Sequence, residues 1–142
     1  MTIRKATTND IEALKMLYWE LLPDEAVDVN PEVIKKIDSL PEYSLLVYEE
    51  DGKVLGTTML IVCYDAVFRN SNFAVIENVV VSSEARGKGI GRKLMDEAEF
   101  IARDNKCIYV LLLSNKKRLN AHKFYRNLGY SDELSLGFKK YL

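Results

Sequence analysis

Apolar residues recur every three or four positions in four stretches of the chain, a spacing that places them on one face of an α-helix. The first stretch opens at Asn9, which forms a capping-box pattern with Glu12, and ends before Pro23, which cannot continue a helix. Pro31 and Pro41 bound the second stretch. The pattern therefore predicts helices over 9–22, 31–40, 89–104 and 117–128.

Strand-like apolar runs separate these helices. Asp51-Gly52 has the composition of a hairpin turn, and the nearly continuous apolar runs 73–81 and 107–113 have the character of strands buried on both faces. Meandering strands come first and β-α-β units follow, so we expect an α/β fold with helices packed on a mixed sheet. The strands are predicted over 2–6, 43–50, 53–63, 73–81, 107–113 and 134–141.

The length of 142 residues suits a single domain over 1–142. The 20 Lys and Arg residues against 21 Asp and Glu residues give a net charge of −1, which argues against a protein that coats nucleic acid or an anionic membrane. No stretch has the character of a signal peptide or could span a bilayer, so we expect a cytoplasmic protein. Cys63 and Cys107 lie in apolar runs and are expected to be reduced thiols, and with His122 as the one histidine we expect no metal site.

The most informative segment is the glycine-rich turn Arg86-Gly87-Lys88-Gly89-Ile90-Gly91, between a β-branched run and an amphipathic helix. Backbone N–H groups at such a helix start can bind an anion, and Arg86 and Lys88 add positive charge. The turn therefore predicts a site for a phosphate-bearing cofactor. A tight strand-to-helix connection without a ligand has the same pattern, and the spacing matches neither a Walker loop nor a dinucleotide fingerprint.

Glu77 interrupts the apolar run 73–81. Strand alternation predicts that it shares a face with Val75 and Val79. Burial of a carboxylate favours its protonated form, and a carboxyl group that titrates near neutral pH suits general-base catalysis. The alternative is a carboxylate at the end of the strand, paired with a lysine or an arginine.

Tyr125 falls on the apolar face of the predicted helix 117–128, where its hydroxyl needs a partner or a ligand. A phenol is protonated at neutral pH and a thiol has a pKa of about 8.5, so a phenol can donate a proton to a departing thiolate. Alternatively, Tyr125 is a core aromatic, as we expect for Phe124. His122 is expected to make a structural hydrogen bond.

Two segments resemble the signatures of the GNAT superfamily of N-acetyltransferases. Arg86, Gly89 and Gly91 occupy the places of its Arg/Gln-x-x-Gly-x-Gly/Ala turn, and the segment 121–130, AHKFYRNLGY, resembles its second signature. The element order also agrees. The resemblance implies a GNAT-like fold, with a mixed sheet of about six to seven strands, four flanking helices and a splay between the fourth and fifth strands.

The resemblance also implies an acyltransferase that moves an acetyl group from acetyl-CoA to a primary amine by direct attack, without a metal. In it, Glu77 would be the general base and Tyr125 the general acid. Backbone groups of Val79 and Val81 would pair with the pantetheine arm. The cofactor-binding residues that it implies are Val79, Val80, Val81, Arg86, Gly87, Lys88, Gly89, Ile90, Gly91, Arg92 and Asn120, with Asn115 as the alternative to Asn120.

The segments 18–31 and 64–72 are expected to bind the acceptor, and they contain acidic and aromatic residues that suit a cationic amine. Alternatively, these residues are ordinary solvated side chains of surface loops. These residues are Tyr18, Trp19, Asp24, Glu25, Asp28, Tyr64, Asp65 and Phe68. A non-catalytic acyl-CoA-binding sensor and a general nucleotide-phosphate binder are the competing interpretations. The apolar residues in 134–142 are compatible with a strand edge that pairs with a second copy in a homodimer.

Overall fold

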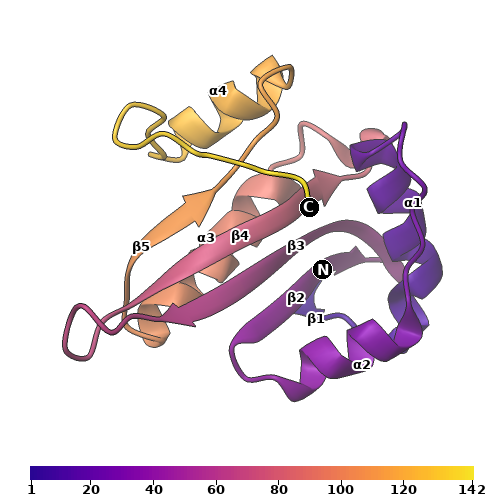
Figure 1. Ribbon diagram of the computed structural model, residues 1–142. Coiled ribbons are helices and arrows are strands. Elements are labelled where there is room, and N and C mark those ends of the chain that lie inside the picture. The colour runs from indigo at the N-terminus through magenta and orange to yellow at the C-terminus, as the bar shows by residue number, and fades with distance from the viewer. The chain divides into compact units, whose positions relative to one another are not determined.

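A five-stranded sheet in the order β1-β2-β3-β4-β5 organises the first part of the chain (Figure 1). The computed structural model describes residues 1–142, which divide into two compact units, Met1–Leu111 and Leu112–Leu142. The first four strands are antiparallel neighbours. The strands are β1 (Thr2–Lys5), β2 (Tyr43–Glu50), β3 (Lys53–Tyr64), β4 (Asn72–Val81) and β5 (Cys107–Leu112).

Four α-helices accompany the sheet, as predicted, and two short 3₁₀ turns cover Thr8–Asp10 and Ser83–Ala85. Three of the helices lie in the first unit and the fourth lies in the second. No helix is long and apolar enough to cross a membrane. The helices are α1 (Ile11–Leu21), α2 (Pro31–Ser39), α3 (Ile90–Asp104) and α4 (Leu119–Asn127).

Helices α1 and α2 cover one face of the sheet and α3 covers the other (Figure 1). On the first face, Leu45 of β2 and Met59 of β3 are cross-strand partners that pack with apolar side chains of α1 and α2. Gly56 lies three residues from Met59 and therefore faces the other way. A Cβ at Gly56 would lie 3.1 Å from Leu94 Cδ1 of α3, so the glycine allows this helix to approach the sheet closely.

The sheet has five strands, so the expectation of about six to seven is wrong. Residues 134–141, predicted as the last strand, have no regular structure, and Leu134 and Phe138 are 86% and 89% exposed. The alternation of apolar residues there is typical of a strand, but a strand also needs a neighbouring edge to accept its hydrogen bonds. The sequence pattern contains no information about that edge.

β5 is the last strand of the sheet, with β4 as its neighbour, and none of its residues is buried, so the expectation of a strand buried on both faces is wrong for it. Asn72 N–H donates to the Lys106 carbonyl at 3.1 Å, and the rings of Phe73 and Tyr109 stack with their centroids 5.5 Å apart. These contacts join the first residues of β4 to the start of β5, and α3 connects the two strands along the chain.

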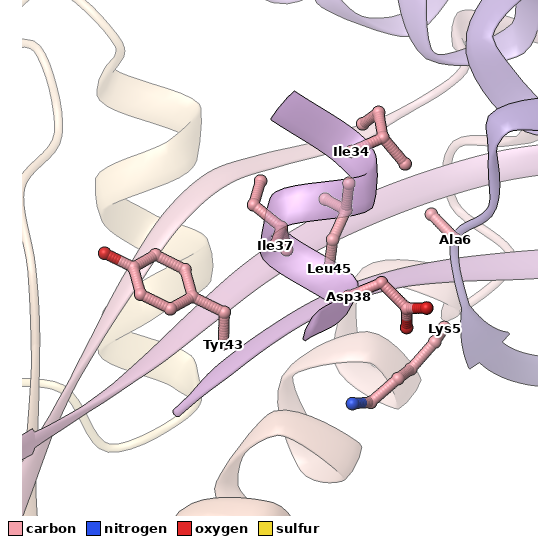
Figure 2. A pocket seen from close by; sticks show the side chains of 7 residues that line it. All are labelled: Lys5, Ala6, Ile34, Ile37, Asp38, Tyr43 and Leu45. Carbon is pink, nitrogen blue, oxygen red and sulfur yellow. The ribbon is translucent and has the colours of Figure 1, made fainter. Parts of the chain in front are cut away.

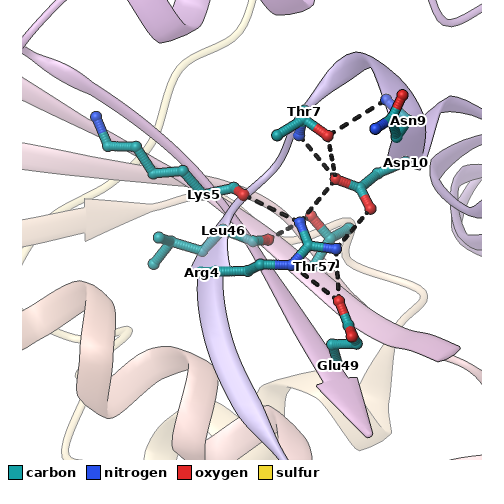
Figure 3. Close-up of polar contacts among 8 residues, drawn as sticks. All are labelled: Arg4, Lys5, Thr7, Asn9, Asp10, Leu46, Glu49 and Thr57. Carbon is teal, nitrogen blue, oxygen red and sulfur yellow. Dashed lines mark hydrogen bonds and ion pairs between the residues drawn. The ribbon is translucent and has the colours of Figure 1, made fainter. Parts of the chain in front are cut away.

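The first helical segment is capped by Thr7 and Asp10, not by the predicted pair Asn9 and Glu12. Asp10 Oδ2 accepts from Thr7 N–H at 2.7 Å, and the two carboxylate oxygens of Asp10 accept from Arg4 at 2.8 Å each (Figure 3). Arg4 also donates to Glu49 at 2.6 and 2.8 Å. Asp10 stands three residues after Thr7, as a capping box requires, and its ion pair with Arg4 holds the carboxylate beside the Thr7 N–H group.

Candidate active site

The 3₁₀ turn Ser83–Ala85 connects the end of β4 to the glycine-rich turn, which leads directly into α3. Ala85 and Ile90 are buried at its two ends and fix it to the body of the first unit. Gly87 and Gly89 have φ angles of 78° and 77°, the left-handed region that favours glycine. A Cβ at either glycine would meet nothing within 4 Å, so the requirement for glycine is conformational.

The first turn of α3 leaves backbone N–H groups available to an anion. Its N-cap is Gly89, which has no side chain to accept from these groups, and the turn contains no acidic residue. The positively charged Lys88 and Arg92 are exposed there, whereas Lys93 lies over the ring of Tyr48 at 5.4 Å. Uncapped N–H groups, the helix dipole and basic neighbours fit a phosphate-bearing ligand.

Arg86 is bound by protein groups. Its Nε donates to the Val81 carbonyl at 3.2 Å and its Nη2 donates to Glu20 Oε2 at 3.1 Å. The same Glu20 oxygen accepts from Ser83 N–H at 2.8 Å. Glu20 lies in the last turn of α1, so this site residue was missed by sequence reasoning, and no local signal in the sequence indicates a contact over 66 residues.

β4 contains a bulge at residues 78–79. Met59 pairs with Glu77, and Thr57 pairs with Val80, so two residues of β4 stand opposite one of β3. Asn78 has a φ of 55°, a conformation that Asn tolerates better than most residues. Thr57 and Met59 lie two residues apart in β3 and therefore share a face of the sheet. Their partners Val80 and Glu77 share that face too, although they lie three residues apart in β4.

Glu77 therefore shares its face with Val75 and Val80, and the predicted neighbour Val79 is not its companion there. The face is the one that α1 covers, as Tyr18 of α1 contacts Thr57. Burial raises the pKa of the Tyr18 hydroxyl, and a hydrogen bond with Thr57 partly opposes the rise. Glu77 itself is half-buried. The candidate base thus lies on the strand that precedes the glycine-rich turn.

Tyr125 lies in the second unit, on α4, and is 9% exposed. Its ring makes edge contacts with Phe124 and Tyr130, at centroid distances of 5.3 and 6.1 Å. His122 Nε2 lies 2.9 Å from the Asn115 carbonyl, the structural hydrogen bond expected for this histidine. Asn120 is exposed on the same helix. The second signature therefore forms a helix that contains the candidate acid and the candidate cofactor amide.

Other features of the structure lie apart from this chemistry. A shallow pocket between α2 and strands β1 and β2 is lined mainly by apolar side chains, with Ile34, Ile37 and Leu45 facing one another and Lys5 at its edge (Figure 2). No group of three or more His, Cys, Asp or Glu side chains is arranged to hold a metal ion. Burial is the main cause that raises the pKa of the Cys107 thiol.

Comparison with known proteins decides the family. The pattern that describes the Acetyltransferase (GNAT) family matches residues 11–130. The chain belongs to the GNAT acetyltransferase family. The resemblance of its two motifs is thereby confirmed, and the protein is an acyltransferase enzyme of the N-acetyltransferase type.

Several relatives of this GNAT chain have named activities. It is 31% identical over 132 residues to an aminoalkylphosphonate N-acetyltransferase of Salmonella typhimurium, covering 90% of this chain and 83% of the relative. It is 27% identical over 133 residues to an aminoglycoside N(6′)-acetyltransferase type 1 of Stenotrophomonas maltophilia, covering 92% and 86%. The crystal structure of glucosamine-6-phosphate N-acetyltransferase from Arabidopsis thaliana superposes with a TM-score of 0.84 at 25% identity, covering 99% of this chain and 97% of that one. GNAT enzymes in general use acetyl-CoA, whose phosphates suit the uncapped N-terminus of α3 and its basic neighbours.

Proposed function

We propose that this GNAT enzyme transfers an acetyl group from acetyl-CoA to a primary amine by direct attack. The observation that carries the proposal is the uncapped N-terminus of α3, which a short 3₁₀ turn and the glycine-rich turn connect to the strand that bears Glu77. Acetyl-CoA supplies the acetyl group as a thioester and the diphosphate that anchors it. The residues of this chain bind the acetyl-CoA, orient the two substrates and transfer protons.

The cofactor is held chiefly by backbone groups. The N–H groups of the turn bind the diphosphate, with Lys88 and Arg92 adding charge. Gly87, Gly89, Ile90 and Gly91 give the turn its shape, and Arg86 supports it. The N–H groups involved are those of Gly87, Lys88, Gly89, Gly91 and Arg92.

The pantetheine arm lies along the end of β4, where we propose that β4 and β5 splay apart. The contacts between the two strands at their first residues support this arrangement, because they leave the far end of β4 for another partner. Val79 and the N–H group of Val81 are offered to the arm. Val80 and Val81 are register partners of Thr57 and Gly56 of β3, and the Val81 carbonyl already accepts from Arg86 Nε at 3.2 Å. Asn120 contributes a side-chain amide to the cofactor.

Proton transfer is assigned to two side chains. An alkyl ammonium has a pKa of about 10.4, so an amine acceptor must lose a proton before it can attack. A carboxylate oxygen of Glu77 takes that proton, directly or through water. Tyr125 Oη donates a proton to the departing sulfur.

The acceptor is an amine bound beside α1, next to the turn. Trp19 is exposed on this helix, as a surface for a cationic ligand requires. Tyr64 and Phe68 are also exposed, but the β3–β4 loop lies at the other end of these two strands from α1, so the two predicted acceptor segments do not form one surface. Tyr64 Oη donates to Glu42 at 2.9 Å, which brings an additional carboxylate to this loop. The relatives that are named for aminoalkylphosphonates and aminoglycosides support a small amine; polyamines, amino acids and protein lysines belong in the same test.

Steady-state kinetics of Glu77→Gln and Tyr125→Phe test the proton assignments. We expect kcat/KM to fall at least tenfold in each, about 1.4 kcal/mol of transition-state stabilisation. Glu133→Gln and Tyr141→Phe make the same chemical changes at exposed positions and should retain wild-type kinetics. A fall of less than about tenfold in both active-site variants would show that these roles are wrong.

A screen of thioester consumption against amine classes identifies the acceptor. If calorimetry shows that CoA binds but no amine in the screen is acetylated, a non-catalytic acyl-CoA sensor would be favoured over an amine acetyltransferase. Tighter binding of ATP than of CoA would favour a general nucleotide-phosphate site.

A further inference from the structure

Glu20 joins two parts of the first unit that are distant in sequence. It lies in the last turn of α1, next in sequence to Trp19. Its Oε2 accepts from Ser83 N–H at 2.8 Å and from Arg86 Nη2 at 3.1 Å. One carboxylate oxygen therefore holds both the 3₁₀ turn after β4 and the first residue of the glycine-rich signature.

The link is more than a pair of exposed charges. An exposed ion pair by itself contributes little to stability, and the Arg86 side chain is 59% exposed. Here, however, Arg86 Nε also donates to the Val81 carbonyl at 3.2 Å, and Ser82 N–H donates to the Leu55 carbonyl at 2.9 Å. The segment between β4 and the turn is thus fixed to β3, to the end of β4 and to α1. Together these contacts fix the position of the segment that leads into the glycine-rich turn.

We propose that Glu20 is a positioning residue for the cofactor turn, acting through Ser83 and Arg86. This inference rests on the proposed function, because it assumes that the turn binds the diphosphate of acetyl-CoA. Two of the Arg86 nitrogens are already engaged, so the backbone N–H groups of the turn, rather than this guanidinium, hold the anion. Glu20 keeps those groups oriented before the cofactor arrives, which lowers the ordering cost of binding. It also couples the position of α1 to the occupancy of the turn.

Removal of Glu20 has two opposing effects on the affinity for CoA. The loss of a negative charge favours an anion nearby, and the loss of orientation disfavours it. The charge effect is screened by salt at this exposed site, with a Debye length of about 8 Å at 0.15 M ionic strength. The orientation effect persists at that ionic strength, so we expect it to dominate.

The test compares Glu20→Ala, Glu20→Gln, Arg86→Ala and the double variant Glu20→Ala/Arg86→Ala at 0.15 M salt. We expect Glu20→Ala to weaken calorimetric binding of CoA and to raise the KM for acetyl-CoA about tenfold, with kcat changed less than about twofold. Glu20→Gln should be intermediate, because its amide oxygen can still accept from Ser83 N–H. The double variant should bind CoA about as poorly as whichever single variant binds it less tightly, because both residues act through one link.

Glu12→Ala is the matched control. Glu12 lies on the same helix and makes an exposed ion pair with Lys15 at 3.0 Å, away from the turn. Its removal should leave both the affinity for CoA and the kinetics unchanged.

Hydrogen exchange without any ligand separates the two levels of the proposal. We expect Glu20→Ala to accelerate amide exchange over 83–91, whereas Glu12→Ala should not. If the wild-type protein fails to bind CoA, the proposed function falls, and exchange still tests the link itself. If the wild type binds CoA but Glu20→Ala binds it equally well or more tightly, or exchanges no faster, the inference about Glu20 is overturned and the proposed function stands. Glu20→Gln, which is nearly isosteric, covers the case in which the alanine variant does not fold.

Discussion

Two adjacent threonines in β3 have identical burial and opposite hydrogen-bonding states. Thr57 and Thr58 are both 0% exposed. Thr57 Oγ1 donates to the Leu46 carbonyl at 2.7 Å, whereas Thr58 Oγ1 has no partner. A buried hydroxyl that makes a hydrogen bond stabilises the fold, and one that makes none costs free energy. The two positions therefore form an internal comparison of the same side chain in the same strand.

Valine substitutions exploit this comparison. We expect Thr57→Val to lower the free energy of unfolding by about 1–2 kcal/mol, because the hydrogen bonds of Thr57 with the Leu46 carbonyl and with the Tyr18 hydroxyl are lost. Thr58→Val should leave that free energy unchanged or raise it by about 1 kcal/mol, because an unpaired hydroxyl is replaced by a methyl group of similar size. Equilibrium denaturation with urea measures both values. Equal losses in the two variants would contradict the assignment of partners.

Site residues differ in how far the sequence could reveal them. Glu77 could be selected because a charge in an apolar run is conspicuous, and the glycines of the turn because their spacing is specific. Glu20 could not, because its importance comes from contacts with Ser83 and Arg86 that only the folded chain creates. Of the two predicted companions of Glu77 on its face, Val75 was predicted correctly and Val79 was not, since regular alternation takes no account of the bulge at Asn78.

At the scale of elements, Arg4, Asp10 and Glu49 form a network that joins β1, the first 3₁₀ turn and β2 (Figure 3). Hydrogen bonds from Arg4 are the main cause that holds the pKa of the Asp10 carboxyl below its usual range, while burial opposes them. The network therefore stabilises these elements when Asp10 is ionised. A depressed pKa in the folded state makes this contribution dependent on pH.

Asp10→Asn tests the network. We expect the variant to lose about 1–2 kcal/mol of unfolding free energy at pH 7, as the partial exposure of Arg4 moderates the effect. Because the folded-state pKa is lower than the unfolded value of about 3.9, the contribution is fully present above about pH 5 and is lost as the pH falls through the folded value. The difference between wild type and variant should thus narrow below about pH 4. If the difference in unfolding free energy between wild type and variant stays constant down to pH 2, it does not come from the ionised Asp10 carboxylate.

Turns and helix ends that are marked by particular residues at the end itself were predicted well. Asp51 and Gly52 both have positive φ angles, as the hairpin signal requires, and Gly129 ends the last helix with a φ of 93°. Pro31 stands in the first turn of α2, after the cap Asn30. The mistaken strand over 134–141 and the bulge depend on which strands become neighbours, and that choice is made by the whole fold.

At the scale of the whole molecule, the C-terminal segment contributes little burial. Leu136 and Tyr141 are 81% and 84% exposed, and the segment has no regular structure. Gly137 passes the side chain of Leu113, where a Cβ would lie 2.5 Å from Leu113 Cδ2. Exposed apolar side chains remove little area from water and therefore stabilise the chain little.

Deletion of residues 134–142 should consequently lower the melting temperature by less than about 3 °C. Differential scanning fluorimetry measures this value. The prediction that the segment pairs with a second copy adds a separate expectation: light scattering should then report two chains for the wild type and one for the shortened protein. A large loss of melting temperature in a protein that is monomeric throughout would show that the segment stabilises its own chain.

The bulge in β4 has a consequence for how this protein could change during evolution. Loss of codon 78 would remove one of the two residues that stand opposite a single residue of β3. Val80 would then follow Glu77 at a spacing of two, so every remaining side chain of the strand would keep its present face. A deletion, usually among the most damaging of mutations in a strand, would here straighten the backbone and leave the inside and the outside of the sheet unchanged.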